Sequence, residues 1–312
     1  LSTDPTVEDT VGQLWYNSTT GKFKISTAGA GAWASSDEIN TARRSMAGTG
    51  TTTAALIAGG IGGTTATETY NGSSWTTSPG SLNTGRQYLK GDGSSTAAIV
   101  FGGVTPISAL TETFDGSTWS ETADLNQARQ KIGNSTLGST TASLCFGGST
   151  APETTSYALT ELWDGTSWSE KADLNQARAG IGGAGTSTAA LAIAGYGPGQ
   201  SPHYSLVEVW DGTSWSEINN VLTGGGEFGS AGTTTSALIY GGQRPSAGKL
   251  TEQYDGSSWT EVADLAVNNQ GCASSGVSGS SALRISGYVP PNVTTVDEWA
   301  DPVYAIKTVT VS

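Results

Sequence analysis

Short apolar runs recur along the chain, and each one is closed by glycine. The runs are TAALIAGG (53–60), TAAIVFGG (96–103), TASLCFGG (141–148), TAALAIAG (188–195), TSALIYGG (235–242) and SALRISGY (281–288). Each run is too short for a typical helix and favours a strand that is buried on both faces. Its small residues suit strands that pack close to a narrow axis. The closing glycines allow a sharp exit and a close backbone approach.

A second pattern follows the first five runs after a variable loop: Thr-Glu (Val-Glu in the fourth copy), a variable residue, an aromatic, a turn and a tryptophan. The turn and tryptophan read NGSSW (71–75), DGSTW (115–119), DGTSW (164–168), DGTSW (211–215) and DGSSW (255–259). Asn-Gly and Asp-Gly favour type I′ turns, so each copy predicts two strands joined by a tight hairpin. We expect the tryptophans of this pattern (Trp75, Trp119, Trp168, Trp215 and Trp259) to pack against a neighbouring sheet, one per repeat.

The repeats are spaced as the blades of a propeller are. Successive tryptophans of the pattern lie 44, 49, 47 and 44 residues apart, a period typical of a four-stranded blade. A sixth copy, over 281–302, lacks a tryptophan strand, which GAW (31–33) can supply from the N-terminal side. The sequence therefore predicts an all-β fold: a six-bladed β-propeller of four-stranded blades over 31–302. The strand of Trp33 would close the ring in the last blade and remove an exposed edge.

Two segments lie outside the repeats. Residues 1–30 are expected to form an attachment or lead-in segment, and the chain starts at Leu1 as a processed or partial product would. VYAIKTVTVS (303–312) alternates β-branched residues. It predicts an extra strand that packs on the propeller or on a neighbouring subunit.

Acids and arginines recur at fixed places in the repeats. The acids are Glu68, Glu112, Glu161, Glu208, Glu252 and Asp297, and the arginines are Arg43 or Arg44, Arg86, Arg129 and Arg178. Because scaffold features repeat whereas binding sites are usually asymmetric, we interpret each acid as paired with an arginine or a backbone N–H inside its blade. The alternative is a ring of acids around the channel that binds a cation. The fifth and sixth copies lack the arginine, so their acids need another partner.

Charge and composition exclude several classes of function. The chain carries 14 Lys and Arg against 27 Asp and Glu, a formal charge of −13, so a nucleic-acid partner is disfavoured. No apolar run approaches the roughly 18 residues of a membrane span. Cys145 and Cys272 are expected to be two small buried thiols rather than a disulfide. No His/Cys cluster has metal-ligand spacing, and we expect neither a metal nor a cofactor.

Catalytic chemistry has little material in this sequence. His203 is the only histidine, and it lies in the Pro/Gly-rich segment 197–206, where we expect a solvent-exposed loop. A Ser-His-Asp set could be built only around it. A sialidase-like site would need the recurring arginines to converge. We therefore expect a protein that is not an enzyme.

The loops that follow the apolar runs differ in length and content, and in a propeller they emerge on one face. They cover 61–67, 104–110, 149–159, 196–206, 243–250 and 289–295. Variation on one face of a rigid scaffold is a common way to build a binding site. The residues there best suited to stack on sugars or to grip a partner are Tyr157, Tyr196, His203, Tyr204 and Arg244.

The Gly-Gly, the aromatic and the downstream tryptophan resemble a Kelch repeat, of the kind found in the central domain of galactose oxidase. The near-identical repeats and the lead-in VGQLWYNSTTGKFKI (11–25) resemble repeat proteins of marine bacteriophage tail fibres. The resemblance implies a virion protein at the extracellular surface that binds a host-surface glycan or another virion component. Two alternatives stay open: a Kelch-type protein-interaction scaffold, and a capsid decoration with no receptor role. Association of copies of the chain also stays open.

Overall fold

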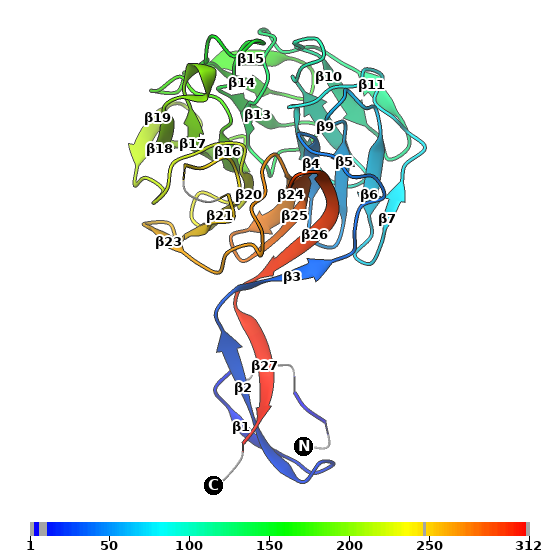
Figure 1. Cartoon of the computed structure of the whole chain (residues 1–312), viewed down its shortest axis with the longest axis vertical. Helices are drawn as coiled ribbons and strands as arrows, with labels where there is room; N and C mark the ends of the chain where they lie inside the picture. The colour runs from blue at the N-terminus through cyan, green and yellow to red at the C-terminus, as the bar shows by residue number, and fades with distance from the viewer. Residues whose placement is uncertain (1–2, 6–10, 246–247, 310–312) are drawn as a thin grey trace.

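The computed structural model describes residues 3–5, 11–245 and 248–309, and these form an all-β molecule (Figure 1). The described residues make seven sheets, one more than the repeats predict. Six have four strands and surround a common centre, and one has three strands and projects away from the ring. The all-β prediction is confirmed, and the arrangement fits a β-propeller.

The six four-stranded sheets are numbered I to VI along the chain. Sheet I contains β4 (Ala47–Gly50), β5 (Ala55–Ala58), β6 (Thr67–Tyr70) and β7 (Trp75–Thr77). Sheet II contains β8 (Lys90–Gly93), β9 (Ala98–Phe101), β10 (Thr111–Phe114) and β11 (Trp119–Glu121). Sheet III contains β12 (Gly133–Asn134), β13 (Ser143–Phe146), β14 (Thr160–Trp163) and β15 (Trp168–Lys171).

The second half of the ring repeats this order. Sheet IV contains β16 (Gly182–Thr186), β17 (Ala189–Tyr196), β18 (His203–Trp210) and β19 (Trp215–Ile218), with a 3₁₀ turn over Pro198–Gln200. Sheet V contains β20 (Gly229–Gly232), β21 (Ala237–Tyr240), β22 (Thr251–Tyr254) and β23 (Trp259–Glu261). Sheet VI contains β24 (Ala273–Ser278), β25 (Ser281–Tyr288), β26 (Asn292–Ala300) and, as its outer strand, β3 (Ala32–Ser36). Among the described residues, no helix is long and apolar enough to cross a membrane.

The pairing of β3 with β26 joins the two ends of the chain in one sheet. Trp33 lies opposite Trp299 in the antiparallel register, and the centroids of their rings are 5.5 Å apart. The Trp33 indole donates to Thr251 Oγ1 of sheet V at 3.1 Å. The strand that the sequence predicts for Trp33 is therefore present.

The seventh sheet, named here the stalk sheet, contains β1 (Leu14–Asn17), β2 (Lys22–Gly29) and β27 (Val303–Thr308). It extends from the rim of the ring beside sheet VI (Figure 1). The predicted C-terminal strand is present as β27, but it pairs with β2 of the stalk sheet rather than packing on the propeller, and its packing on a neighbouring subunit stays a prediction. The reason is continuity, because β26 and β3 are neighbours in sheet VI and leave it side by side.

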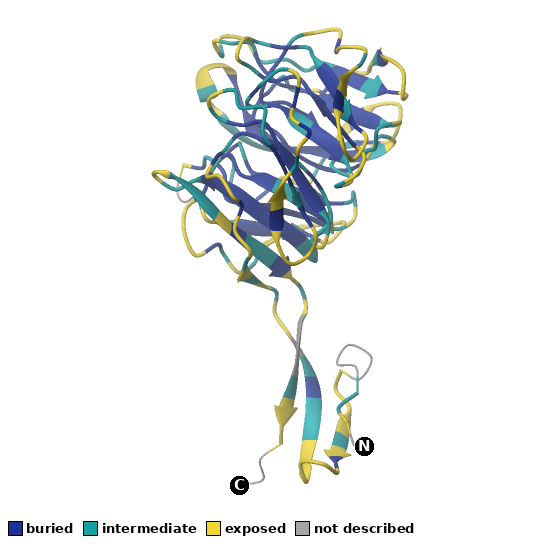
Figure 2. Cartoon of the chain, turned by 90° about the vertical axis from the view of Figure 1, so that its right-hand side faces the viewer, coloured by how far each residue is buried: buried dark blue, intermediate teal, exposed yellow. Residues whose placement is uncertain are grey.

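Buried residues concentrate in the strands inside the ring (Figure 2), and the second strands of the four-stranded sheets are among them. Strands β5, β9, β13 and β21 are buried along their whole length. Apolar clusters lie between adjacent sheets, and one of them joins Leu56 of sheet I to Val100 and Trp119 of sheet II. These runs lack the polar alternation of a half-exposed strand because both of their faces pack against neighbouring sheets.

Outer-strand tryptophans bond to the preceding sheet. The indole nitrogens of Trp119, Trp168 and Trp215 donate to Thr67, Thr111 and Thr160, at 3.0 Å in each case. Each threonine begins the third strand of the sheet before. The expected packing of one tryptophan per repeat against a neighbouring sheet is confirmed, and for these three tryptophans a directional hydrogen bond adds to the apolar contact.

The Asp-Gly turns make tight hairpins, but the predicted type I′ geometry is wrong. Gly116 has φ of 97°, whereas Asp115 is not in the left-handed region that type I′ requires at both central residues. Instead, Asp115 Oδ1 accepts the backbone N–H groups of Ser117 and Thr118, each at 2.8 Å. A four-residue loop organised by the aspartate side chain thus replaces the two-residue turn.

Candidate functional site at the centre of the ring

Six backbone hydrogen bonds close a circle at the centre of the propeller, with one residue from the entrance of each four-stranded sheet. In order, Ser45 donates to Gly271, Gly271 to Glu227, Glu227 to Gly180, Gly180 to Lys131, Lys131 to Tyr88 and Tyr88 back to Ser45, at 2.6 to 3.2 Å. All six residues have positive φ, between 52° and 65°. We call these six residues the central ring.

A second circle of backbone bonds fixes the loops around the central ring. The second residue of each Gly-Gly or equivalent pair donates to the next sheet: Gly60 to Arg86, Gly103 to Arg129, Gly148 to Arg178, Gly195 to Gly225, Gly242 to Asn269 and Gly287 to Arg43. Gly59 has φ of 72°, and a Cβ there would lie 2.6 Å from the Arg86 carbonyl oxygen. The expected close backbone approach is confirmed, and the loops after the second strands share the face that surrounds the central ring. We call this face the loop face.

The side chains of the central ring differ at every non-glycine position, although its backbone repeats. Serine, tyrosine, lysine and glutamate occupy four places, and glycine occupies the other two. A scaffold feature would repeat its residue type, as the buried arginines do, so this variation singles out the centre as a candidate functional site. The left-handed backbone carries a conformational cost for the four non-glycine residues.

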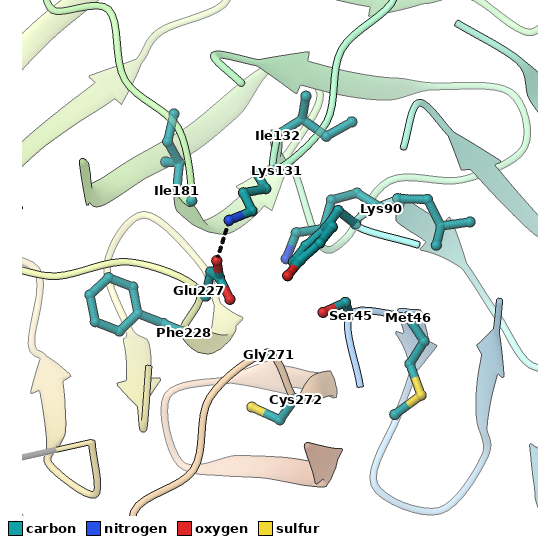
Figure 3. Close-up of a pocket in the computed structure, with 13 residues that line it drawn as sticks. Ser45, Met46, Lys90, Lys131, Ile132, Ile181, Glu227, Phe228, Gly271 and Cys272 are labelled. Carbon is teal, nitrogen blue, oxygen red and sulfur yellow. Dashed lines mark ion pairs between the residues drawn. The ribbon is translucent and has the colours of Figure 1, made fainter. Parts of the chain in front are cut away.

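Lys131 is the centre of a charged cluster (Figure 3). Its Nζ lies 2.6 Å from Glu227 Oε1 and 2.8 Å from Glu153 Oε1. Tyr196 donates its hydroxyl to Glu227 at 2.9 Å. The Lys131 amine also lies 4.6 Å from the centroid of the Tyr88 ring. The Lys131 amine thus faces two carboxylates, and Lys90 lines the same cavity.

Burial and the neighbouring charges set the protonation of this cluster. Burial alone would lower the pKa of Lys131, but Glu227 and Glu153 outweigh it and raise that pKa. Burial raises the pKa of Tyr196, and Glu227 adds to the effect. Lys131 therefore stays charged and Tyr196 stays protonated at neutral pH.

The cavity inside the central ring is small. It has a volume of about 40 Å³ and is lined by central-ring residues together with Lys90 and Cys272. A cavity of this size holds a water molecule or a small ion rather than an organic substrate. The side chains at the centre of the ring therefore leave little free volume, and the ion pairs of Lys131 hold two of them in place.

The recurring acids and arginines form buried ion pairs. Each acid bonds an arginine of its own sheet: Glu68 with Arg43, Glu112 with Arg86, Glu161 with Arg129, Glu208 with Arg178, Glu252 with Arg244 and Asp297 with Arg284. In the fifth copy the partner is Arg244, from the loop after β21, and in the sixth it is Arg284, from strand β25. These two arginines replace the ones that the fifth and sixth copies lack. The arginines are consumed in these pairs, so they do not converge on a common site.

Two of the predicted binding residues are buried rather than exposed. Tyr196 is fully buried at the end of β17, and Arg244 is 8% exposed with its guanidinium 2.5 Å from Glu252 Oε1. Both were expected in loops, but strand β17 extends through Tyr196, and Arg244 takes the place of the arginine that the fifth copy lacks. The expectation that these two side chains face solvent is wrong.

The other three predicted residues are half-buried on the loop face. His203 begins strand β18 rather than lying in an exposed loop, and its ring centroid is 6.2 Å from that of Tyr196. Tyr204 Oη accepts a hydrogen bond from Gln176 at 3.4 Å. The backbone of Tyr157 donates to Gly148 at 2.8 Å. No ring contact or side-chain hydrogen bond of the described residues joins these three side chains to one another.

The remaining chemistry-bearing residues are dispersed. Within residues 3–5, 11–245 and 248–309, no three His, Cys, Asp or Glu side chains gather as metal ligands. Cys145 and Cys272 are free and buried, as expected. Burial raises the pKa of Cys145 to about 12 and that of Cys272 to about 11.

Sequence reasoning missed the central ring. Its residues stand two positions after the arginine in the first four copies, in the pairs Arg43/Ser45, Arg86/Tyr88, Arg129/Lys131 and Arg178/Gly180. The only sequence signal is a position that varies inside an otherwise constant segment and is glycine in some copies. That signal marks a left-handed backbone, but it does not reveal the circle of bonds.

Comparisons with known proteins support the fold. No protein-family model matches the chain, and no curated protein matches it. The solved structure of YjhT, a Kelch-like β-propeller, superimposes with a TM-score of 0.66 at 13% sequence identity, covering 86% of this chain and 99% of YjhT. At that identity, the likeness shows the β-propeller fold alone.

Proposed function

We propose that this chain is a non-enzymatic virion protein, a propeller head that binds a host-surface glycan or another virion component through its loop face. The observation that carries the proposal is the contrast between constant and variable parts. Interior polar residues repeat as ion pairs within each sheet, whereas the loops around the central ring differ from sheet to sheet. A rigid frame with variable loops on one face is the usual design of a binding module.

The stalk sheet agrees with this proposal. It holds the head by its rim, next to sheet VI, and so does not cover the centre of the ring (Figures 1 and 2). Leu14, Tyr16 and Phe23 of the stalk sheet are 59%, 47% and 51% exposed. Apolar exposure of this kind favours contact with another virion component or with a further copy of the chain.

The absence of an assembled catalytic set in the described residues motivates the non-enzymatic part. Among the described residues, His203 Nε2 has no hydrogen-bond partner and His203 is in no ion pair, and the arginines are paired inside their sheets. The cavity at the centre is too small for a sugar ring. A protein-interaction scaffold and a capsid decoration are the alternative functions.

The test is to purify phage particles from the source of this protein and to determine by mass spectrometry whether the particles contain it. In parallel, the fluorescently labelled full chain is added to host cells. Presence in particles together with saturable cell binding supports the proposal. Presence without cell binding favours a decoration. Absence from particles, with stable capture of a cellular protein, favours the scaffold.

A further inference from the structure

A cleft on the loop face lies between sheets V and VI, away from the central ring. Its volume is about 270 Å³. That is slightly below the range of roughly 300 to 1,000 Å³ that is usual for small-molecule sites. Its lining includes Gln243, Arg244, Asn268, Asn269, Gln270 and Tyr288. The cleft has room for one sugar ring rather than for an oligosaccharide.

The cleft exists because sheet VI departs from the repeat. Asn269 stands where the first four copies have arginine, and Arg284 of strand β25 pairs with Asp297 instead. An asparagine in place of the arginine leaves a much shorter side chain at position 269. In sheet III, the residue equivalent to Gln270 is Gln130, which is buried and donates to the Thr150 carbonyl at 2.9 Å.

The walls of the cleft offer unused amide groups. Among the described residues, the side chains of Gln243, Asn268 and Gln270 have no hydrogen-bond partner, and Asn268 is exposed. Backbone bonds fix their positions: Tyr288 donates to the Gln270 carbonyl at 2.9 Å, and Gln243 to Gly226 at 2.7 Å. Amides both donate and accept, which matches the hydroxyl groups of a sugar.

Two buried atoms of the lining are also unpaired within the described residues. They are Nη2 of Arg244, a donor, and Oδ1 of Asn269, an acceptor. An unmet buried polar group destabilises the unliganded protein, so a ligand that satisfies both atoms gains affinity from them. A hydroxyl can accept from the guanidinium and donate to the amide oxygen after a small side-chain movement.

Charge and stacking narrow the class of ligand. Glu252 neutralises Arg244, so the lining carries no uncompensated charge. The guanidinium of Arg44 lies 4.1 Å from the centroid of the Tyr288 ring and holds that ring in place. A tyrosine offers an apolar ring face and a polar tip, the combination that suits a pyranose.

We infer that the cleft between sheets V and VI binds a single neutral pyranose unit of a glycan. The inference rests on the proposed function and names the site and the sugar class that serve it. Binding needs no movement of the backbone, since the Gln270–Tyr288 and Gln243–Gly226 bonds already set the walls. The expected affinity for one sugar is weak, and repeated units on a surface would strengthen it.

The experiment is saturation-transfer NMR on the full chain with methyl glycosides of glucose, galactose, mannose and N-acetylglucosamine, and with glucuronic and sialic acids. At least one neutral glycoside is expected to bind. Gln270→Ala and Asn268→Ala are each expected to weaken it roughly tenfold. Gln127→Ala, an exposed amide on the loop face outside the cleft, is the control and should bind as the wild type does.

Three results would overturn the inference: no neutral glycoside binds, both cleft variants bind normally, or only the acidic sugars bind. Cell binding separates this failure from failure of the proposed function. If the wild type and Gln270→Ala both bind host cells equally, the loop face still binds and the cleft is not the site. If the wild type binds neither cells nor particles, the proposed function itself fails.

Discussion

The indole nitrogen of Trp168 donates to Oγ1 of Thr111 in the preceding sheet, at 3.0 Å. Trp259 and Trp75 occupy the same place in sheets V and I, but their indole nitrogens are buried without a partner among the described residues. The explanation is in the preceding sheets, where Val207 and Val296 replace the threonine. Val207 shares an apolar cluster with Trp259, and Val296 shares one with Trp75.

Restoring the threonine should therefore stabilise the protein. Val207→Thr and Val296→Thr each add the missing acceptor, and each is expected to raise the free energy of unfolding by about 0.5 to 1.5 kcal/mol. Urea unfolding measures the change. Thr111→Val is the reverse control and should lower the free energy by a similar amount or more. Destabilisation by Val207→Thr would show that the hydroxyl does not reach the indole.

The buried ion pairs should be costly to break from one side. Arg129→Met leaves Glu161 charged and buried, and we expect a loss of about 3 to 5 kcal/mol in the free energy of unfolding. The double variant Arg129→Met/Glu161→Leu should recover much of it. Lys249→Met is the matched control, because Lys249 is exposed and its pair with Asp264 spans 3.7 Å, so the expected change is near zero. An equal loss of free energy of unfolding in Arg129→Met and Lys249→Met would contradict this account.

The turn aspartates predict a loss of stability in acid. Backbone N–H groups lower the pKa of Asp115, Asp164, Asp211 and Asp255, the last to about 2. A carboxyl whose folded pKa lies below its unfolded value of 3.8 stabilises the fold above pH 3.8. That contribution is lost as the pH falls through the folded pKa. Tm followed by circular dichroism should fall between pH 4 and pH 2.

Replacing the four aspartates with asparagine tests the cause. Asn71 occupies the same position in sheet I and accepts the same bonds from Ser73 and Ser74, at 3.0 and 2.9 Å. The asparagine variants should therefore fold and show a flatter acid dependence of Tm. An unchanged acid dependence would place the titration elsewhere.

The two cysteines should be unreactive in the folded protein. Both are buried, and their pKa values are raised, so little thiolate is present at pH 8. We expect negligible reaction with a thiol reagent in buffer and two equivalents in denaturant. Cys272 lines the central cavity, so its rapid labelling in the native state would show that the centre of the ring opens.

Much of the fold could be predicted from residues that repeat. The place of Trp33 in the last sheet could be predicted because the other copies show that the sixth copy lacks an outer strand. The pairing of Glu161 with an arginine could be predicted because an acid and an arginine recur together in the copies. The stalk sheet could not be predicted, since its strands occur once and pair across almost the whole length of the chain. The candidate sites were harder still. Tyr196 and Arg244 looked like loop residues, and only packing shows that one is buried and the other is paired.

The sequence by itself determined the all-β class, the strand order within each repeat and the pairing of the chain ends, because these depend on local patterns of polarity and turn residues. Only the tertiary structure decided what surrounds each polar side chain. The central ring joins six residues that lie roughly 45 positions apart, and the cleft beside Gln270 depends on an arginine that is absent. Contacts of this kind arise from closing the ring, which brings together residues that no local pattern relates.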